Sequence, residues 1–181
     1  MFNARKEIAA IGQRLFAEKL NHSHSGNISS RCGDSILITR TGSQTGYLQM
    51  DDIVEVNIHA SYAGRASMEY PVHKAIYLST DAKNIVHCHP PVTIALSLDR
   101  DFIEPVDAEG RFYFRKIPIL SVDNAIASDE VAARIPELFA ESPVVVVRGH
   151  GVFSIGRSLE EAYKFVSSLE ASALIIWYSK R

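Results

Sequence analysis

Apolar residues near the start of the chain recur at the spacing of an amphipathic helix. Ile8, Leu15 and Leu20 follow this period, and charged residues occupy the opposite side of the pattern. Asn3 has the side chain of an N-cap, so the pattern predicts a first helix that begins at this residue. The polar stretch of residues 21–27, which contains Gly and Asn, predicts a loop after the helix.

The rest of the chain alternates short runs of β-branched and apolar residues with helical patterns. Strands are predicted over residues 28–31, 35–39, 52–57, 84–89, 117–120 and 143–147. Helices are predicted from Tyr70 to about Thr80, after Pro90-Pro91, over residues 128–139, and from Ser158 to about Trp177. Four consecutive valines in residues 143–147 are typical of a strand buried on both faces. Ser158 and Glu161 have the spacing of a capping box.

This alternation predicts an α/β or α+β fold in one layer-packed domain over residues 1–181. A chain of 181 residues, of which 46% are hydrophobic and 22% charged, can bury one ample core. We find no repeats, no low-complexity tracts and no Pro/Gly/Ser-rich linker in the sequence. The two common nucleotide-binding fingerprints, GxGxxG and GxxxxGK followed by Ser or Thr, are also absent.

Charge and cysteine usage narrow the classes of function. The formal net charge of −2 supplies no broad basic face for a nucleic acid or an anionic membrane, so we expect neither as a partner. No apolar run reaches the roughly 18 residues that a membrane span needs. Cys32 and Cys88 lie far apart, and the first ten residues lack the apolar run of a secretory signal, so we expect a cytoplasmic protein.

Three of the seven histidines are placed where they can hold a metal ion. His87 and His89 are two residues apart on a predicted strand, so their rings point to one face while Cys88 points to the other as a buried, inert side chain. His150 lies between two glycines, which leave its ring room to approach. Three neutral imidazoles predict a zinc-like site with open coordination positions. The alternative is that each histidine only forms a hydrogen bond in the core or at a strand end.

Glu69 stands at the start of the helix that precedes the two strand histidines. Its carboxylate could ligate the metal or take a proton, and the alternative is a partner of the helix dipole. His73 is four residues further on and shares the face of Glu69. A supporting or packing role is favoured for His73 over a role as a further ligand.

Three short segments offer backbone N–H groups and hydroxyls that could bind a phosphate. They are Gly26-Asn27, Thr41-Gly42-Ser43 and Ser67. Each alone is an ordinary turn, and the set matters only if the fold gathers the three segments around the metal.

Taken in order along the chain, these motifs resemble those of the class II aldolase/adducin family. The motifs that carry the resemblance are Gly26-Asn27-Ile28-Ser29, Ile38-Thr39-Arg40-Thr41-Gly42, Ser67-Met68-Glu69 followed by His73, His87-Cys88-His89-Pro90, and Gly149-His150-Gly151-Val152. They extend over nearly the whole chain, with spacings similar to those of the family's fuculose-1-phosphate aldolases. Five motifs in the same order are far more specific than any one of them.

The resemblance implies a fold, a cofactor and roles for residues. The fold would be a central, mainly antiparallel sheet flanked by helices, assembled as a homotetramer with active sites at subunit boundaries. One Zn²⁺ per subunit, with manganese or cobalt as alternatives, would be bound by His87, His89, His150 and Glu69. Glu69 would also be the catalytic acid/base, displaced from the metal when substrate binds. The substrate phosphate would be surrounded by Gly26, Asn27, Thr41, Gly42 and Ser67.

The activity implied is cleavage of a ketose 1-phosphate, similar to fuculose 1-phosphate, into dihydroxyacetone phosphate and a short aldehyde through a metal-stabilised enediolate. The alternatives within the superfamily are a sugar-phosphate 4-epimerase, a dehydratase and a decarboxylase. The epimerases typically carry aspartate at the position of Glu69. A non-catalytic, adducin-like scaffold is the remaining alternative, but such domains lose the metal histidines that this chain retains.

Three positions depart from the family pattern. Met68 replaces a second serine of the phosphate site, which predicts weaker phosphate binding or a different anion. Arg40 replaces a common proline and either adds positive charge near the phosphate or faces solvent. The family's tyrosine proton donor has no counterpart in residues 103–110, so the second proton donor stays open among Asp107, Glu109 and Tyr113.

Overall fold

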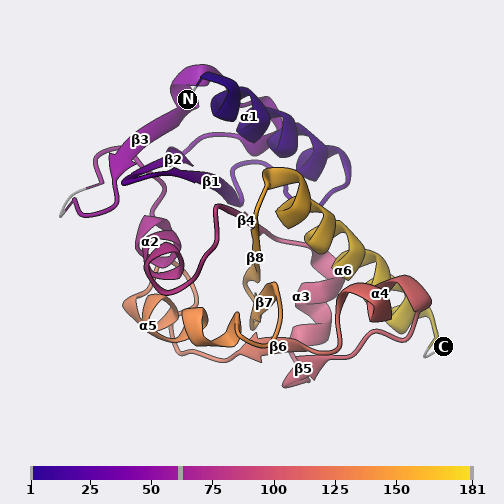
Figure 1. Ribbon diagram of the computed structural model, residues 1–181. Helices are drawn as coiled ribbons and strands as arrows, with labels where there is room; N and C mark the ends of the chain where they lie inside the picture. The colour runs from indigo at the N-terminus through magenta and orange to yellow at the C-terminus, as the bar shows by residue number, and fades with distance from the viewer. Residues whose placement is uncertain (1, 61–62, 180–181) are drawn as a thin grey trace.

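One eight-stranded sheet forms the centre of the computed structural model, which describes residues 2–60 and 63–179 (Figure 1). Its strands are β1 (Asn27–Cys32), β2 (Ser35–Thr39), β3 (Ile53–Asn57), β4 (Asn84–Cys88), β5 (Phe102–Ile103), β6 (Ile117–Leu120), β7 (Val144–Val147) and β8 (Gly151–Gly156). Their order in the sheet is β3-β2-β1-β4-β8-β7-β6-β5. The β6–β7 pair is parallel and the other pairs are antiparallel, which confirms the predicted mainly antiparallel sheet.

Helices cover both faces of this sheet (Figure 1). One face carries α1 (Phe2–Ala17), α3 (Pro91–Ser97), α4 (Ala108–Tyr113) and α6 (Leu159–Ser179), and the other carries α2 (Tyr70–Ser79) and α5 (Asp129–Leu138). Two single 3₁₀ turns, η1 (Thr45–Tyr47) and η2 (Met50–Asp52), connect β2 to β3. The sheet therefore separates two apolar cores, and the α/β class with flanking helices is confirmed.

The valine strand shows how the sequence produces the two cores. Side chains alternate along a strand, so Val144 and Val146 of β7 enter the core beneath α1 and α6, while Val145 and Val147 enter the core beneath α2 and α5. All four are fully buried. β7 is therefore covered on both faces, as its unbroken apolar run predicts.

The predicted helix starts hold in two places and fail in a third. Ser128 caps α5 by accepting a hydrogen bond from the Val131 N–H at 3.1 Å. Ser158 likewise accepts from the Glu161 N–H, although the Glu161 carboxylate accepts from the Arg157 N–H and so does not complete the capping box. The prediction for Asn3 is wrong because this residue lies inside α1, where its side chain donates to Glu7.

The sequence patterns miss β5, α4, β8 and the two 3₁₀ turns η1 and η2. In addition, α1 ends at Ala17, whereas the predicted periodicity runs on to Leu20. Leu20 is buried even so, because the turn beyond the helix folds back on the core. The single-domain boundary of 1–181 stays a prediction.

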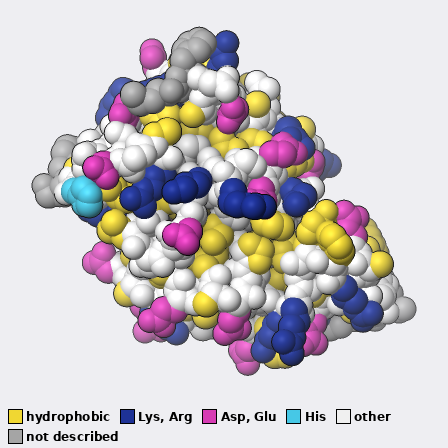
Figure 2. All heavy atoms as spheres, in the orientation of Figure 1, with side chains coloured by type: hydrophobic (Ala, Val, Ile, Leu, Met, Phe, Trp, Pro, Cys, Tyr) yellow, Lys and Arg dark blue, Asp and Glu magenta, His cyan; other side chains and the backbone are white. Residues whose placement is uncertain are grey.

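The surface carries charges of both signs. On the face drawn in Figure 2, Lys and Arg side chains are interspersed with Asp and Glu. Among the described residues, none of the helices has both the length and the hydropathy that crossing a bilayer would require.

Candidate active site

The middle of the sheet positions the first two histidines. His87 lies on β4, and His89 is the first residue beyond the end of this strand. Between them Cys88 points into the core beneath α1 and α6, where it is fully buried and burial raises the pKa of its thiol. The predicted alternation therefore places the two imidazoles on one face and an inert thiol on the other.

His150 reaches the same point from the turn between β7 and β8. Since β8 pairs with β4, with Val152 opposite Cys88, the turn brings the third ring beside the other two. The ring centroids of His87, His89 and His150 lie 4.8 to 4.9 Å apart, and their candidate ligand atoms all lie within 4.8 Å of one another. The structure thus brings together the three histidines that the sequence singles out.

This approach depends on the glycines around His150. Gly149 has a φ of +68°, a conformation that side chains other than glycine rarely adopt. A Cβ atom at Gly151 would lie 2.6 Å from the Cys88 carbonyl oxygen and 2.8 Å from Cδ2 of His89. A side chain at Gly151 would push the turn away from the other two rings, and one at Gly149 would strain its backbone.

The surroundings of the rings keep them neutral and oriented. Nδ1 of His87 donates to the Val152 carbonyl oxygen at 3.0 Å, so its Nε2 presents a lone pair. The Phe153 ring stacks on the His87 ring at 4.0 Å between centroids. Burial, and then the neighbouring imidazoles, lower the pKa of His87 well below its ordinary value. Burial also lowers the pKa of His89 to about 4 and lowers that of His150.

Glu69 lies beside this cluster at the N-terminus of α2. Its side chain does not cap the helix. Instead Oε1 accepts from the Ala127 N–H at 2.9 Å and lies 3.9 Å from Nε2 of His150. Oε2 is buried without a hydrogen-bond partner among the described residues, and burial raises the pKa of the carboxyl group. The geometry therefore favours a metal ligand or proton carrier over a partner of the helix dipole.

These residues fit a divalent cation. Three neutral imidazoles supply nitrogen lone pairs, and beside them lies the Glu69 carboxylate, whose Oε1 is 3.9 Å from Nε2 of His150 and whose Oε2 is unpartnered among the described residues. Nitrogen and carboxylate ligands suit zinc and also other first-row transition metals, so the donor set defines a metal site without selecting one ion.

A cleft opens in front of the imidazoles. It is lined by His24, Ser25, Gly26, Asn27, Arg40, Thr41, Gly42, Ser43, Ser67, Met68, Glu69, His87, His89, Ile126 and His150. The three candidate phosphate segments, far apart in the sequence, therefore lie around one cavity that also holds the metal-site residues. This arrangement is the condition for the three segments to form a phosphate site together.

The fold fixes two of these segments against each other. The Thr41 hydroxyl donates to the Ala66 carbonyl oxygen at 2.8 Å, and the Thr41 N–H donates to that of Arg65 at 3.1 Å. The Ser67 N–H in turn donates to the Thr39 carbonyl oxygen at 3.0 Å. The two walls of the cleft are therefore held together by hydrogen bonds to the backbone.

Arg40 and Met68, the two departures from the family pattern at the phosphate site, both line this cleft. The Arg40 guanidinium pairs with Asp52 at 2.7 Å and donates to the Thr41 carbonyl oxygen at 3.2 Å. Arg40 is the one Lys or Arg among the described lining residues. Arg40 therefore lies at the cleft, with its guanidinium paired to Asp52.

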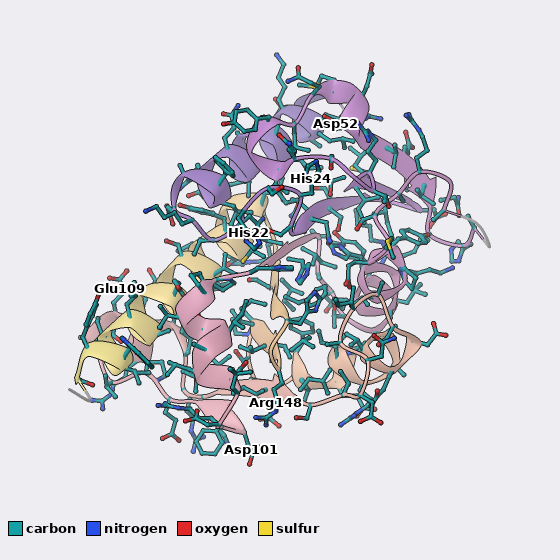
Figure 3. All side chains as sticks on the ribbon, turned by 180° about the vertical axis from the view of Figure 1, so that it is seen from behind. His22, His24, Asp52, Asp101, Glu109 and Arg148 are labelled. Atoms are coloured by element: carbon teal, nitrogen blue, oxygen red, sulfur yellow. The ribbon has the colours of Figure 1, made fainter. Side chains whose placement is uncertain are left out.

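The candidate proton donors on α4 do not line the cleft of their own chain. Asp107 caps α4 by accepting from the Gly110 N–H at 2.7 Å, and the Tyr113 ring packs against Phe165 of α6. Figure 3 shows Glu109 on α4 at one end of the molecule, well away from His22 and His24 on the loop beyond α1. If one of these residues serves a site, it serves one formed with another subunit.

Sequence patterns miss several residues that shape the site. Phe153 and the Val152 carbonyl oxygen follow His150 directly on β8, and recognising that strand would have revealed them. Ile126 and Ala127 come from the loop before α5, which carries no motif. His24 lines the cleft from a polar loop where the sequence predicts no functional role.

The site thus combines a candidate metal centre with a cleft lined by loop backbone and hydroxyl groups, and comparison with known proteins identifies the family. The family described as Class II Aldolase and Adducin N-terminal domain matches residues 6–177, and the chain belongs to this family. The predicted resemblance is thereby confirmed.

The relatives within the family include two kinds of lyase. An L-fuculose phosphate aldolase of Methanocaldococcus jannaschii is 30% identical over 174 residues, which cover 93% of each chain. A methylthioribulose-1-phosphate dehydratase of Acidiphilium cryptum is 33% identical over 181 residues, covering 91% of this chain and 85% of the relative. The crystal structure of L-fuculose-1-phosphate aldolase from Thermus thermophilus superposes with a TM-score of 0.94 at 34% identity, covering 98% of this chain and 95% of that one.

Proposed function

We propose that the protein is a metal-dependent aldolase that cleaves a ketose 1-phosphate, similar to fuculose 1-phosphate, into dihydroxyacetone phosphate and a short aldehyde. One observation carries the proposal: three neutral imidazoles and the buried Glu69 carboxyl group meet in a cleft whose other walls offer hydroxyls, backbone N–H groups and Arg40. A phosphate and a pair of sugar oxygens are the groups that such a cleft can bind at the same time.

His87, His89 and His150 would hold the cation, which we propose to be zinc, with Glu69 as a fourth ligand in the resting site. When bound, the cation would supply positive charge beside the sugar oxygens that become negative during the reaction. The hydrogen bond from His87 to Val152 and the stacked Phe153 ring hold the first of these ligands in place before any ion arrives.

Glu69 would move the proton at carbon. Breaking the C3–C4 bond leaves an electron pair at C3, which must be protonated to complete dihydroxyacetone phosphate. Because burial raises the pKa of Glu69, this carboxyl group can carry a proton closer to neutral pH than an exposed glutamate can. In the direction of synthesis the same oxygen would take the proton from C3.

The phosphate group would lie at the end of the cleft formed by Gly26, Asn27, Thr41, Gly42 and Ser67. Arg40 would add the positive charge that a dianion requires, in place of the hydroxyl that Met68 does not provide. With the Arg40 guanidinium present and the hydroxyl at position 68 absent, the site still selects a charged group.

The second proton transfer, at the C4 oxygen, requires a group that the cleft of one chain does not supply from α4. We propose a homotetramer in which α4 of a neighbouring subunit reaches the cleft and presents Asp107, Glu109 or Tyr113. The exposed Phe112 ring on α4 gives this helix apolar surface for such a contact.

A dehydratase is the second candidate, favoured by the methylthioribulose-1-phosphate dehydratase among the relatives. That substrate is also a ketose 1-phosphate, so the phosphate end and the metal ligands would serve both reactions equally. The two candidates differ in the bond that breaks, because a dehydratase expels a hydroxyl as water and leaves the carbon chain intact. A non-catalytic scaffold is disfavoured, since all three histidines are present and converge.

The deciding experiment incubates the zinc-loaded protein with fuculose, rhamnulose, ribulose and xylulose 1-phosphates, with methylthioribulose 1-phosphate and ribulose 5-phosphate in parallel. A coupled reductase reports dihydroxyacetone phosphate. Triose release from a ketose 1-phosphate supports the aldolase. Loss of water from methylthioribulose 1-phosphate without triose release would show that the protein is a dehydratase and not an aldolase. Interconversion of pentose 5-phosphates would show that it is an epimerase.

A further inference from the structure

Behind the cleft, four side chains on β1 and α2 form a continuous buried hydrogen-bond chain. The Tyr77 hydroxyl lies 2.8 Å from Oγ of Ser29, and the same Oγ lies 2.7 Å from Nδ1 of His73. Nε2 of His73 lies 2.6 Å from Oδ1 of Asn27. Ser29 and His73 are fully buried, Tyr77 is 1% exposed, and only Asn27 reaches the cleft.

The Tyr77 hydroxyl, at the buried end of the chain, determines which group donates in each hydrogen bond. Burial raises the pKa of Tyr77 far above its ordinary value, so the phenol keeps its hydrogen. Ser29 is the one side chain within hydrogen-bond distance of the Tyr77 hydroxyl among the described residues, so the phenol donates to Ser29 Oγ. The single hydrogen of Ser29 is then free to be donated onward to Nδ1 of His73.

His73 accepts a hydrogen bond from Ser29 and donates one to Asn27. His73 is fully buried and its two ring nitrogens meet a hydroxyl and an amide oxygen, not a carboxylate, so the ring is neutral and carries one N–H hydrogen. Nδ1 accepts from Ser29, so the hydrogen sits on Nε2, which donates to Oδ1 of Asn27. A flipped Asn27 amide would set N–H against N–H inside a buried site, an arrangement that leaves both donors unsatisfied.

The amide of Asn27 is therefore held with its oxygen inward. Its Nδ2 group has no acceptor among the described side chains and carries two hydrogens at the wall of the cleft. Two fixed N–H donors beside the backbone of Gly26 suit an anionic oxygen and reject a cation or a second donor.

We propose that Tyr77, Ser29 and His73 are positioning residues that lock the Asn27 amide with its N–H groups toward the cleft, and thereby set the affinity for the substrate's phosphate. The inference rests on the proposed function, in which Asn27 contacts that phosphate. None of the three positioning residues touches the substrate.

Tyr77→Phe tests the chain at its far end, because it removes the hydrogen that fixes the direction and leaves the ring in place. Tyr70→Phe is the matched control: Tyr70 is also buried on α2, and its hydroxyl donates to the Asn57 carbonyl oxygen at 3.1 Å, outside the chain. In the zinc-loaded protein, Tyr77→Phe should weaken the binding of inorganic phosphate by about three- to tenfold, while Tyr70→Phe leaves it unchanged.

A double-mutant cycle separates positioning from a general loss of structure. If Tyr77 acts through the Asn27 amide, Tyr77→Phe should have no further effect on phosphate affinity in an Asn27→Ala background. Equal phosphate affinities in Tyr77→Phe and Tyr70→Phe, or an undiminished effect in the Asn27→Ala background, overturn the inference.

The tautomer of His73, read by nitrogen NMR, tests the direction without any ligand. A hydrogen on Nε2 supports the inference, and a hydrogen on Nδ1 overturns it. Should inorganic phosphate fail to bind the wild-type protein, the phosphate site of the proposed function is lost, whereas the tautomer still decides the direction of the chain. The two failures are thus distinguishable.

Discussion

Nε2 of His87 and Nε2 of His89 lie 3.0 Å apart, and the only N–H hydrogen of the neutral His87 ring is committed to the Val152 carbonyl oxygen. In the metal-free protein the neutral His89 ring donates its hydrogen from Nε2 to the lone pair on Nε2 of His87, and a cation bound between the rings would take the place of that hydrogen. The site is therefore built ahead of the ion, and metal binding should act on the stability of the whole fold.

Zinc should raise the unfolding temperature of the wild-type protein, because an ion that binds only the folded state adds about 2.7 kcal/mol when its concentration is 100 times Kd. His89→Ala should show no zinc-induced rise in unfolding temperature. Elemental analysis should find no metal bound to this variant. The exposed His59→Ala should keep both. A full zinc-induced shift in His89→Ala would exclude this histidine as a ligand.

Glu69→Gln should keep much of the bound metal and lose most turnover, by a factor of about 10² to 10⁴, because the amide cannot carry the proton. Steady-state release of dihydroxyacetone phosphate, together with the metal content, measures the two effects separately. Glu55→Gln, an exposed glutamate on β3, is the control and should match the wild type. An unchanged rate in Glu69→Gln would remove Glu69 as the acid/base.

Arg40→Ala should raise KM for a ketose 1-phosphate about tenfold and leave kcat close to its original value, because the guanidinium binds the phosphate in the ground state and the transition state alike. The KM of Arg40→Lys should lie between those of the wild type and Arg40→Ala, because lysine keeps the positive charge and lacks the planar guanidinium group. Arg65→Ala removes an exposed cation that does not line the cleft and should leave KM unchanged. A fall in kcat alone would show that Arg40 acts at the reacting carbons instead.

The stability of the metal-free protein should decrease in mild acid, in part because of His73. Burial lowers the pKa of this ring from 6.5 to about 3, so below pH 6.5 the unfolded chain binds a proton that the folded chain refuses. The contribution is fully present above about pH 6.5 and is lost toward pH 3, at about 1.4 kcal/mol per pH unit between these values.

Urea unfolding of the metal-free protein between pH 6 and pH 4.5 measures this slope. His87, His89 and His150, whose pKa values burial also lowers, add to the slope in every variant, so His73→Gln should lower it by about one proton and not to zero. His59→Gln, a substitution at an exposed histidine, is the control variant. Identical slopes in wild type and His73→Gln would contradict the assignment to His73.

The pattern of apolar and polar residues predicts two kinds of element correctly. One kind has one face in the core and the other in water, and the other kind is buried on both faces. The valine run of β7 and the strand of residues 35–39 are examples, and each is followed by an arginine that interrupts the apolar pattern. The pattern failed for α4, a six-residue helix interrupted by Gly110, and for β5, which has two residues. β8 escaped notice because its first residue, Gly151, belongs equally to the turn that carries His150.

The candidate site divides in the same way. Strand alternation alone indicates that His87 and His89 share a face, because this is a local property of the backbone. The approach of His150 and the gathering of three loops depend on the pairing of β8 with β4, which no local pattern specifies. The family resemblance, which compares the order of motifs over the whole chain, supplied that long-range information.

Gly151 and Met68 differ in the room that each position leaves for another side chain. Any amino-acid change at this position sets a new carbon against two imidazole-bearing residues, so mutational libraries should return glycine there whatever activity is selected. Met68, on the rim and 64% exposed, has no such neighbours to displace. We therefore expect substitutions that alter substrate preference to be tolerated at the rim and not in the hairpin that carries His150.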